Sequence, residues 1–226
     1  IAAAVIGHGA PNTRARQRFA LAQAASLPAG AWVLEGKLTP AQRDEAALGW
    51  LLAQYQFNRY RPGKAASAPA LLRLPEGCDG PRLLAMAEGE FLTRDLINTP
   101  AADMGPEELE QALAALATRF GATLRVVRGD DLLTQNFPMI HAVGRASPRA
   151  PRIMEMAWGS AGPHLTLVGK GVCFDTGGLN IKTSGMTLMK KDMGGAATVM
   201  GLAQMIMQLN LPIRLRVIIA AVENVI

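Results

Sequence analysis

Four charged residues lie within two apolar, glycine-rich segments of this sequence. Lys170 and Asp175 belong to LVGKGVCFDTGG, and Lys182 and Asp192 belong to the stretch that follows, NIKTSGMTLMKKDMGGAA. A charged group is costly to bury unless it is paired or binds a metal ion. The segments therefore indicate either ion pairs in a core or a site that binds cations.

Each carboxylate also has an ordinary structural interpretation. Asp175 precedes a Gly-rich turn and is suited to an Asx turn, and Asp192 lies just before an expected helix, where it is suited to an N-cap. The amines are harder to explain in this way. Lys170 follows four apolar residues, so we expect either a salt bridge to Asp175 or a neutral amine that binds a metal. The second alternative requires its pKa to fall far below the usual value of about 10.4. Lys182 is then a second amine that stays protonated opposite carboxylates or a substrate carbonyl.

Two other kinds of site fit these segments less well. A P-loop requires G-x-x-x-x-G-K-[ST], but Lys170 is followed by Gly and lacks the earlier Gly. Cys173 has no His nearby in sequence to activate it, and His141 could reach it only through the fold, so we interpret Cys173 as a core residue. Lys190 and Lys191 are expected to be a solvated pair beside the site.

Composition limits the class of protein. The chain has 226 residues, of which 50% are hydrophobic and 18% charged, which suits one large or two small folded domains. The net charge is +5, but the basic residues are scattered and aromatic residues make up only 5%, so nucleic acid is not the expected partner. Cys78 and Cys173 form no CxxC motif and are expected to be buried, reduced thiols of a cytoplasmic protein.

No stretch of 18 apolar residues occurs, so we expect no transmembrane helix. The opening IAAAVIGHGA lacks both a basic n-region and an initiator Met. We interpret it as the start of a piece of a longer protein and not as a signal peptide.

Residues 1–80 are expected to form part of a smaller amino-terminal α/β domain. The patterns predict a strand at 31–36, a helix at 39–57 that Thr39 caps, and a loop at 58–70. A connecting helix is predicted over 81–99, ending before Pro100.

Helices and strands alternate in the remaining residues, 100–226. Two helices are predicted at 105–121 and 194–210, and three strands at 122–129, 164–171 and 213–225. This alternation is typical of an α/β fold with a mixed, largely parallel sheet that has helices on both faces. Sites in such sheets gather at the carboxyl ends of strands, where Lys170, Asp175, Glu223 and Asn224 all lie.

The segments VGKGVCFDTGG, NIK and MKKDMGGAA, in this order, closely resemble the signature segments of the leucine (cytosol) aminopeptidases, which are dimetal exopeptidases. RDLINTPAADMGPEEL and NFPMIHAVGRASPRAPR resemble the entry into the catalytic domain of the same family. The resemblance covers residues 90–226 and is weak over residues 1–90.

The resemblance implies a role for each charged residue. Two divalent metal ions, Mn²⁺ or Zn²⁺, would be bound, with Lys170 and Asp192 on one ion and Asp175 bridging both. Lys182 would be the catalytic amine that polarises the scissile carbonyl and stabilises the oxyanion. Met189 would line the pocket for the first side chain of the substrate, with an ordinary core Met as the alternative.

The function implied is that of a metal-dependent aminopeptidase, which releases leucine-like residues from peptides with a free amino terminus by means of a dimetal-activated water. The resemblance also implies a homohexamer, and the lack of a long apolar stretch leads us to expect no membrane partner. The alternative is a non-catalytic nucleic-acid-binding or regulatory protein on an aminopeptidase-like scaffold.

Part of the family's ligand set is absent from this sequence. The family supplies a further Asp, Glu and Arg from an NTDAEGR-like segment, and no such segment occurs here. Glu223 is expected to be an ordinary residue at a strand end and not a replacement ligand. Residues 100–226 are therefore expected to be the first, truncated part of the catalytic domain, and the 226-residue piece is expected to be inactive by itself.

Overall fold

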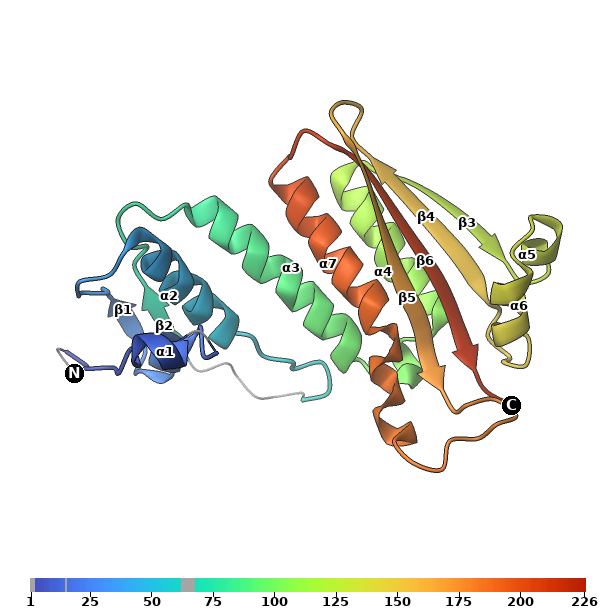
Figure 1. Cartoon of the computed structure of the whole chain (residues 1–226), viewed down its shortest axis with the longest axis horizontal. Coiled ribbons are helices and arrows are strands. Elements are labelled where there is room, and N and C mark those ends of the chain that lie inside the picture. Colours follow the sequence, from blue (N-terminus) through green and yellow to red (C-terminus); the bar gives the residue numbers. More distant parts are fainter. Residues whose placement is uncertain (1–2, 15, 62–67) are drawn as a thin grey trace. The chain divides into compact units, whose positions relative to one another are not determined.

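The computed structural model describes residues 3–14, 16–61 and 68–226. The chain folds as two compact units, residues 1–91 and 92–226, and the long helix α3 (Gly80–Asn98) contributes to both. Figure 1 shows the elements of each unit. The domain boundaries at 80 and 100 stay a prediction, and the expected loop 58–70 lies partly outside the described residues.

The first unit contains two short parallel strands and a few helices. Its elements are α1 (Pro11–Arg14), the 3₁₀ helix η1 (Ala20–Ser26), β1 (Gly30–Trp32), α2 (Pro40–Ala53) and β2 (Ala70–Leu72). Thr39 caps α2 as expected, because its side chain accepts a hydrogen bond from the Gln42 amide. Trp50 anchors a small core, and its indole donates to the carbonyl of Ala70 at 2.9 Å.

The second unit follows in the order η2 (Ala101–Asp103), α4 (Pro106–Phe120), β3 (Thr123–Arg128), α5 (Asp131–Thr134), α6 (Pro138–Gly144), β4 (Arg152–Trp158), β5 (His164–Asp175), η3 (Met186–Met193), α7 (Gly194–Gln208) and β6 (Arg214–Asn224). Both predicted helices and all three predicted strands of this region are present. Gly121 ends α4 in the left-handed conformation, with φ of 66°, as its position after the helix predicts.

The sheet of the second unit has the strand order β3-β4-β6-β5. The α/β class with a mixed sheet is confirmed, but the expected predominance of parallel pairing is wrong for the described residues. Only β5 and β6 pair in parallel, whereas β3–β4 and β4–β6 are antiparallel. The difference comes from β4, a strand that the sequence analysis did not predict and that lies between β3 and β6.

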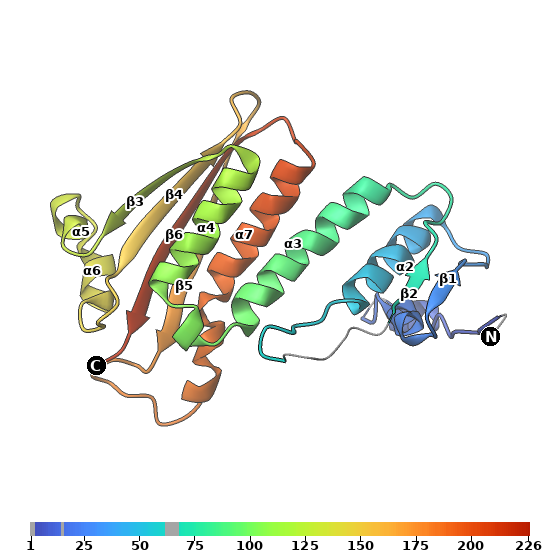
Figure 2. The ribbon, with the colours of Figure 1, turned by 180° about the vertical axis from the view of Figure 1, so that it is seen from behind.

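The helices α4 and α7 pack on one face of this sheet, as Figure 2 shows from behind. Inward-facing residues of the strands form a core with them, including Met154, Met156, Val217 and Ile219. Among the described residues, Figure 1 shows no long helix laid along the opposite face of the sheet. Val168 of β5, which alternates with the buried Gly169, is 70% exposed. The long helices of the described sheet therefore lie along one face, whereas the short helix α6 packs near the end of β6, where a Cβ on Gly144 would lie 3.3 Å from Val222. No helix in the described ranges is long and apolar enough to cross a membrane.

Candidate active site

Three neighbouring elements of the second unit carry the four charged residues. Lys170 lies within β5 and Asp175 is its last residue, whereas Lys182 lies in the loop that follows. Asp192 belongs to η3, the 3₁₀ helix that leads into α7. These elements come together because η3 and α7 both pack against β5.

Lys170 forms an ion pair with Asp192. Its Nζ donates to Oδ1 of Asp192 at 2.8 Å, so the expected salt bridge to Asp175 is not the one that forms. The side chain of Lys170 is 61% exposed, whereas that of Asp192 is only 14% exposed. The expectation that Lys170 is buried is therefore wrong, because β5 is the edge strand of the described sheet.

Asp192 does not cap α7. The residue at the N-cap position is Met193, and no side chain makes the capping hydrogen bond there. Within the described ranges, Oδ2 of Asp192 is buried and has no hydrogen-bond partner. A buried carboxylate oxygen without a donor is unfavourable, so this oxygen marks a position suited to a cation.

Two glycines allow α7 to approach β5 closely. A Cβ on Gly169 would lie 2.7 Å from the Cα of Ala196, and a Cβ on Gly195 would lie 2.9 Å from the backbone nitrogen of Lys170. Both distances are too short for a side chain. The glycines of the two segments thus bring the start of α7, and with it Asp192, next to Lys170.

Asp175 is held by three donors. Its Oδ1 accepts from the Gly177 amide at 2.8 Å, which is the expected Asx turn, and from Nδ2 of Asn224 at 2.7 Å. Its Oδ2 lies 3.3 Å from Nζ of Lys182. Burial raises the pKa of Asp175, but the hydrogen bonds from Gly177, Asn224 and Lys182 together bring it below its ordinary value. Asp175 is therefore ionised at neutral pH.

The turn after Asp175 depends on glycine. Gly177 and Gly178 have φ of 97° and 62°, in the left-handed region. A Cβ on Gly178 would also lie 2.7 Å from Oδ1 of Asn224. Gly178 thus lets the turn close against Asn224.

The four residues therefore form two ion pairs, Lys170–Asp192 and Lys182–Asp175. Among the described residues, no hydrogen bond or ion pair joins one pair to the other, and no group of three His, Cys, Asp or Glu side chains is placed to hold a metal. The site offers two carboxylates and two amines, and Met189 lies half-buried in η3 beside them.

Lys190 differs from its expected role as a solvated residue. Its Nζ donates to the carbonyl of Leu96 at 2.9 Å, and burial lowers its pKa to about 8. Lys191 is exposed, as expected. Cys173 is fully buried, and burial raises the pKa of its thiol to about 12, which fits a core residue and not a nucleophile. Cys78 is a free thiol but only partly buried, contrary to the expectation.

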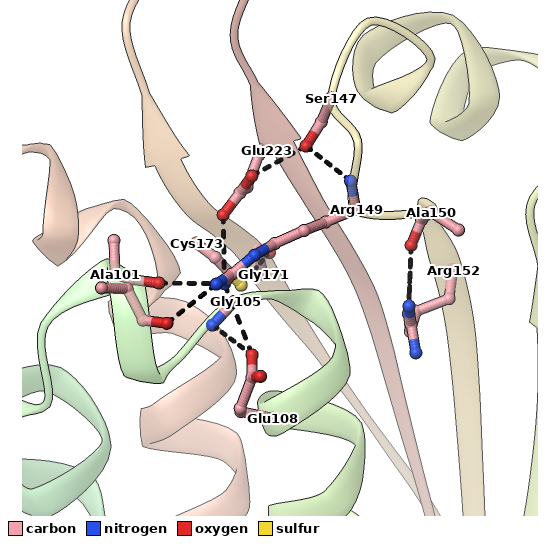
Figure 3. A network of polar contacts seen from close by, with 11 residues as sticks. Ala101, Gly105, Glu108, Ser147, Arg149, Ala150, Arg152, Gly171, Cys173 and Glu223 are labelled. Carbon is pink, nitrogen blue, oxygen red and sulfur yellow. Dashed lines mark hydrogen bonds and ion pairs between the residues drawn. The ribbon is translucent and has the colours of Figure 1, made fainter.

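Glu223 is engaged in a network on the other side of the β6 end (Figure 3). Ser147 donates to its carboxylate at 2.8 Å, and the guanidinium of Arg149 lies 3.5 Å from it. Arg149 also donates to the carbonyls of Ala101 and Ala102, at 3.0 and 2.8 Å. Glu223 is thus paired within this network, and its expected role as an ordinary strand-end residue stays a prediction, whereas the contacts of Arg149 and Asn224 were missed. The signal for Asn224 was its place at the carboxyl end of a strand beside Asp175.

The fold and these paired charges define an α/β protein with a candidate cation site at one end of its sheet. Residues 91–226 match the catalytic domain of the cytosol aminopeptidase family. The chain belongs to this family, as the resemblance of its segments implied.

Several relatives match most of this chain in sequence or in structure. The probable cytosol aminopeptidase of Rhodococcus jostii (strain RHA1) is 32% identical over 196 residues, which cover 79% of this chain and 39% of that protein. The crystal structure of the cytosol aminopeptidase from Coxiella burnetii matches with a TM-score of 0.80 and 49% identity, over 88% of this chain and 44% of that one. The bottromycin maturation enzyme BotP in complex with Mn matches with a TM-score of 0.80 and 32% identity, over 91% and 47%. This chain thus spans less than half the length of these relatives.

Proposed function

We propose that the complete protein containing this sequence is a metal-dependent aminopeptidase, which releases leucine-like residues from the amino terminus of peptides. Membership of the cytosol aminopeptidase family supports this activity. The Mn complex of BotP supports the dependence on a metal. On the basis of the family resemblance, we also propose that the protein binds two divalent ions, Mn²⁺ or Zn²⁺. We propose a cytosolic location because the relatives are named cytosol aminopeptidases.

The observation that carries the proposal is the buried Oδ2 of Asp192, which no donor in the described ranges reaches. Lys170 and Asp192 would hold one ion, and Asp175 would bridge both. An amine and carboxylates suit either metal, because Zn²⁺ accepts nitrogen and oxygen ligands and Mn²⁺ is suited to carboxylates. In the structure each carboxylate pairs with an ammonium group, and Lys170 would hold a metal only as the neutral amine, after losing its proton.

Divalent ions bound here would supply the nucleophile by lowering the pKa of a bound water towards neutrality. Lys182 would hold its ammonium beside Asp175 and donate to the carbonyl oxygen of the scissile peptide, where negative charge develops. The ion pair between Lys182 and Asp175, at 3.3 Å, would hold this ammonium at the site. Met189 would contact the first side chain of the substrate.

The relatives reported above are named as aminopeptidases or as a maturation enzyme, and none of these names supports the nucleic-acid-binding alternative. We also propose a homohexamer, on the basis of the family resemblance. The mass of the complete protein in light scattering tests this assembly, and a monomeric mass would contradict it.

Hydrolysis of leucine p-nitroanilide by the complete protein with Mn²⁺ or Zn²⁺ tests the activity. We expect turnover that requires metal, and a loss in kcat of about 10²–10³ in Lys182→Met, as for other oxyanion donors. Lys191→Met is the matched control, because Lys191 is an exposed lysine of the same region. Absence of turnover with metal, or full turnover in Lys182→Met, would contradict the proposal.

A further inference from the structure

We infer that Asn224 is a positioning residue of the metal site, which fixes the carboxylate of Asp175 so that one oxygen alone faces the cations and Lys182. This inference rests on the proposed function, because it assigns a metal to Asp175. It adds a residue that would touch neither metal nor substrate. Asn224 would act through the aspartate that it holds.

The two oxygens of Asp175 have different surroundings. Oδ1 accepts two hydrogen bonds, from the Gly177 amide at 2.8 Å and from Nδ2 of Asn224 at 2.7 Å. Among the described residues, Oδ2 forms an ion pair with Lys182, at 3.3 Å. An oxygen with two lone pairs is satisfied by the two donors to Oδ1, and rotation of the carboxylate would break both hydrogen bonds. Oδ2 is therefore the oxygen left for a cation.

The donor on Asn224 is itself held in place. Asp175 and Asn224 are register partners at the end of the parallel β5–β6 pair. The carbonyl of Asn224 accepts from the amide and the hydroxyl of Thr176, at 2.9 and 3.1 Å. Gly178 lies against Oδ1 of Asn224, where a Cβ would be 2.7 Å away. The side chain thus lies between Asp175 and the turn.

The preceding residue anchors the strand end on its other side. Glu223 accepts from Ser147 at 2.8 Å and pairs with Arg149, whose guanidinium also binds two carbonyls of η2 (Figure 3). Side chains of consecutive strand residues point to opposite faces. Because Glu223 is fixed on one face, Asn224 is directed to the other with its amide towards Asp175.

The chemistry at this position requires a neutral donor. An Asp at position 224 would have the same shape, but its carboxylate oxygen could not donate a hydrogen bond to Oδ1 of Asp175. Partners that orient metal ligands by hydrogen bonds change metal affinity about 10–100-fold when they are removed. Asn224 is placed to have an effect of this size.

The test compares Mn²⁺ affinity, measured by calorimetry, in three forms of the complete protein. In Asn224→Leu, which keeps the size of the side chain but removes the donor, we expect affinity to fall about 10–100-fold. In Thr176→Val, which removes a hydrogen bond of the same turn but leaves both donors to Asp175, we expect unchanged affinity. Unchanged affinity in Asn224→Leu, with normal binding by the unaltered protein, would overturn this inference alone.

Absence of binding of both Mn²⁺ and Zn²⁺ in the unaltered protein would instead overturn the proposed function together with this inference. A crystal structure of the unaltered, Mn²⁺-loaded protein gives a second test that does not depend on the folding of a variant. We expect Nδ2 of Asn224 within about 2.7–3.2 Å of the same Asp175 oxygen. An amide turned away from Asp175 would overturn the inference.

Discussion

The Nζ of Lys170 lies 2.8 Å from Oδ1 of Asp192, although the two residues are 22 positions apart in sequence. This ion pair joins the edge strand β5 to η3, the segment that leads into α7. Lys170 is largely exposed and Asp192 is largely buried. The pair therefore brings an accessible amine to a carboxylate whose other oxygen has no donor within the described residues.

The first prediction separates the contribution of Lys170 to stability from its contribution to metal binding. Lys170 is exposed but its partner Asp192 is largely buried, so Lys170→Met leaves a buried carboxylate without its donor and should lower the free energy of unfolding of the metal-free protein by about 1–3 kcal/mol. The Mn²⁺ affinity of the same variant should also fall. The fall should exceed the factor of about 10–100 that is typical when a residue that only orients a metal ligand is removed. Urea unfolding and calorimetry measure the two quantities. Equal Mn²⁺ affinity in Lys170→Met and unaltered protein would refute a ligand role for this amine.

A second prediction concerns the close approach of α7 to β5. In Gly169→Ala the new Cβ meets the backbone of α7, 2.7 Å from the Cα of Ala196, so we expect a destabilisation of about 1–3 kcal/mol from overpacking. The start of α7 must move, and Mn²⁺ affinity should fall with it. Gly194→Ala is the control, because its Cβ would lie 3.8 Å from Ile97 in ordinary contact. Chemical denaturation of both variants gives the comparison, and equal stabilities would show that the approach is not tight.

A third prediction follows from Glu110, which lies far from the candidate site in the chain. The hydrogen bond from Arg128 lowers the pKa of Glu110 below its ordinary value of 4.5 against the opposing effect of burial, and Arg152, at 2.6 Å, lowers it further. A carboxyl with a lowered folded-state pKa stabilises the fold above its unfolded value and loses this contribution as pH falls through the folded value.

Glu110→Gln should therefore be less stable than the unaltered protein by about 1.5–3 kcal/mol at neutral pH, the usual range for hydrogen bonds to charged groups. The difference should stay constant down to about pH 4.5 and shrink at lower pH. Urea unfolding between pH 3 and 7 measures it. A stability difference that does not change with pH would show that the charge of Glu110 is not involved.

Much of the fold could be predicted from local patterns. The capping of α2 by Thr39, the Gly121 end of α4 and the strands that carry Lys170 and Asn224 all follow from adjacent residues. The strand β4 was missed, although its buried Arg152, Met154 and Met156 alternate with partly buried residues in the way of a half-buried strand. Because β4 lies between β3 and β6, its omission made the sheet look largely parallel.

The residue types of the candidate site could be predicted, but not all of its pairings. Sequence order suggested Lys170 with Asp175, whereas the packing of η3 on β5 brings Asp192 to Lys170 and leaves Asp175 to Lys182. The contact of Asn224 with Asp175 depends on the β5–β6 register, which no local pattern specifies. Local patterns report neighbours in the chain, whereas these contacts are made across the sheet.

The most direct measurement for the central claim is anomalous diffraction from crystals of the complete protein loaded with Mn²⁺. We expect ions at ligand distance from Nζ of Lys170, from Asp192 and from Oδ2 of Asp175, with the present Lys170–Asp192 ion pair replaced by contacts to metal. Mn²⁺ bound elsewhere, with Lys170 still paired to Asp192 and Oδ2 of Asp192 still without a partner, would contradict the account.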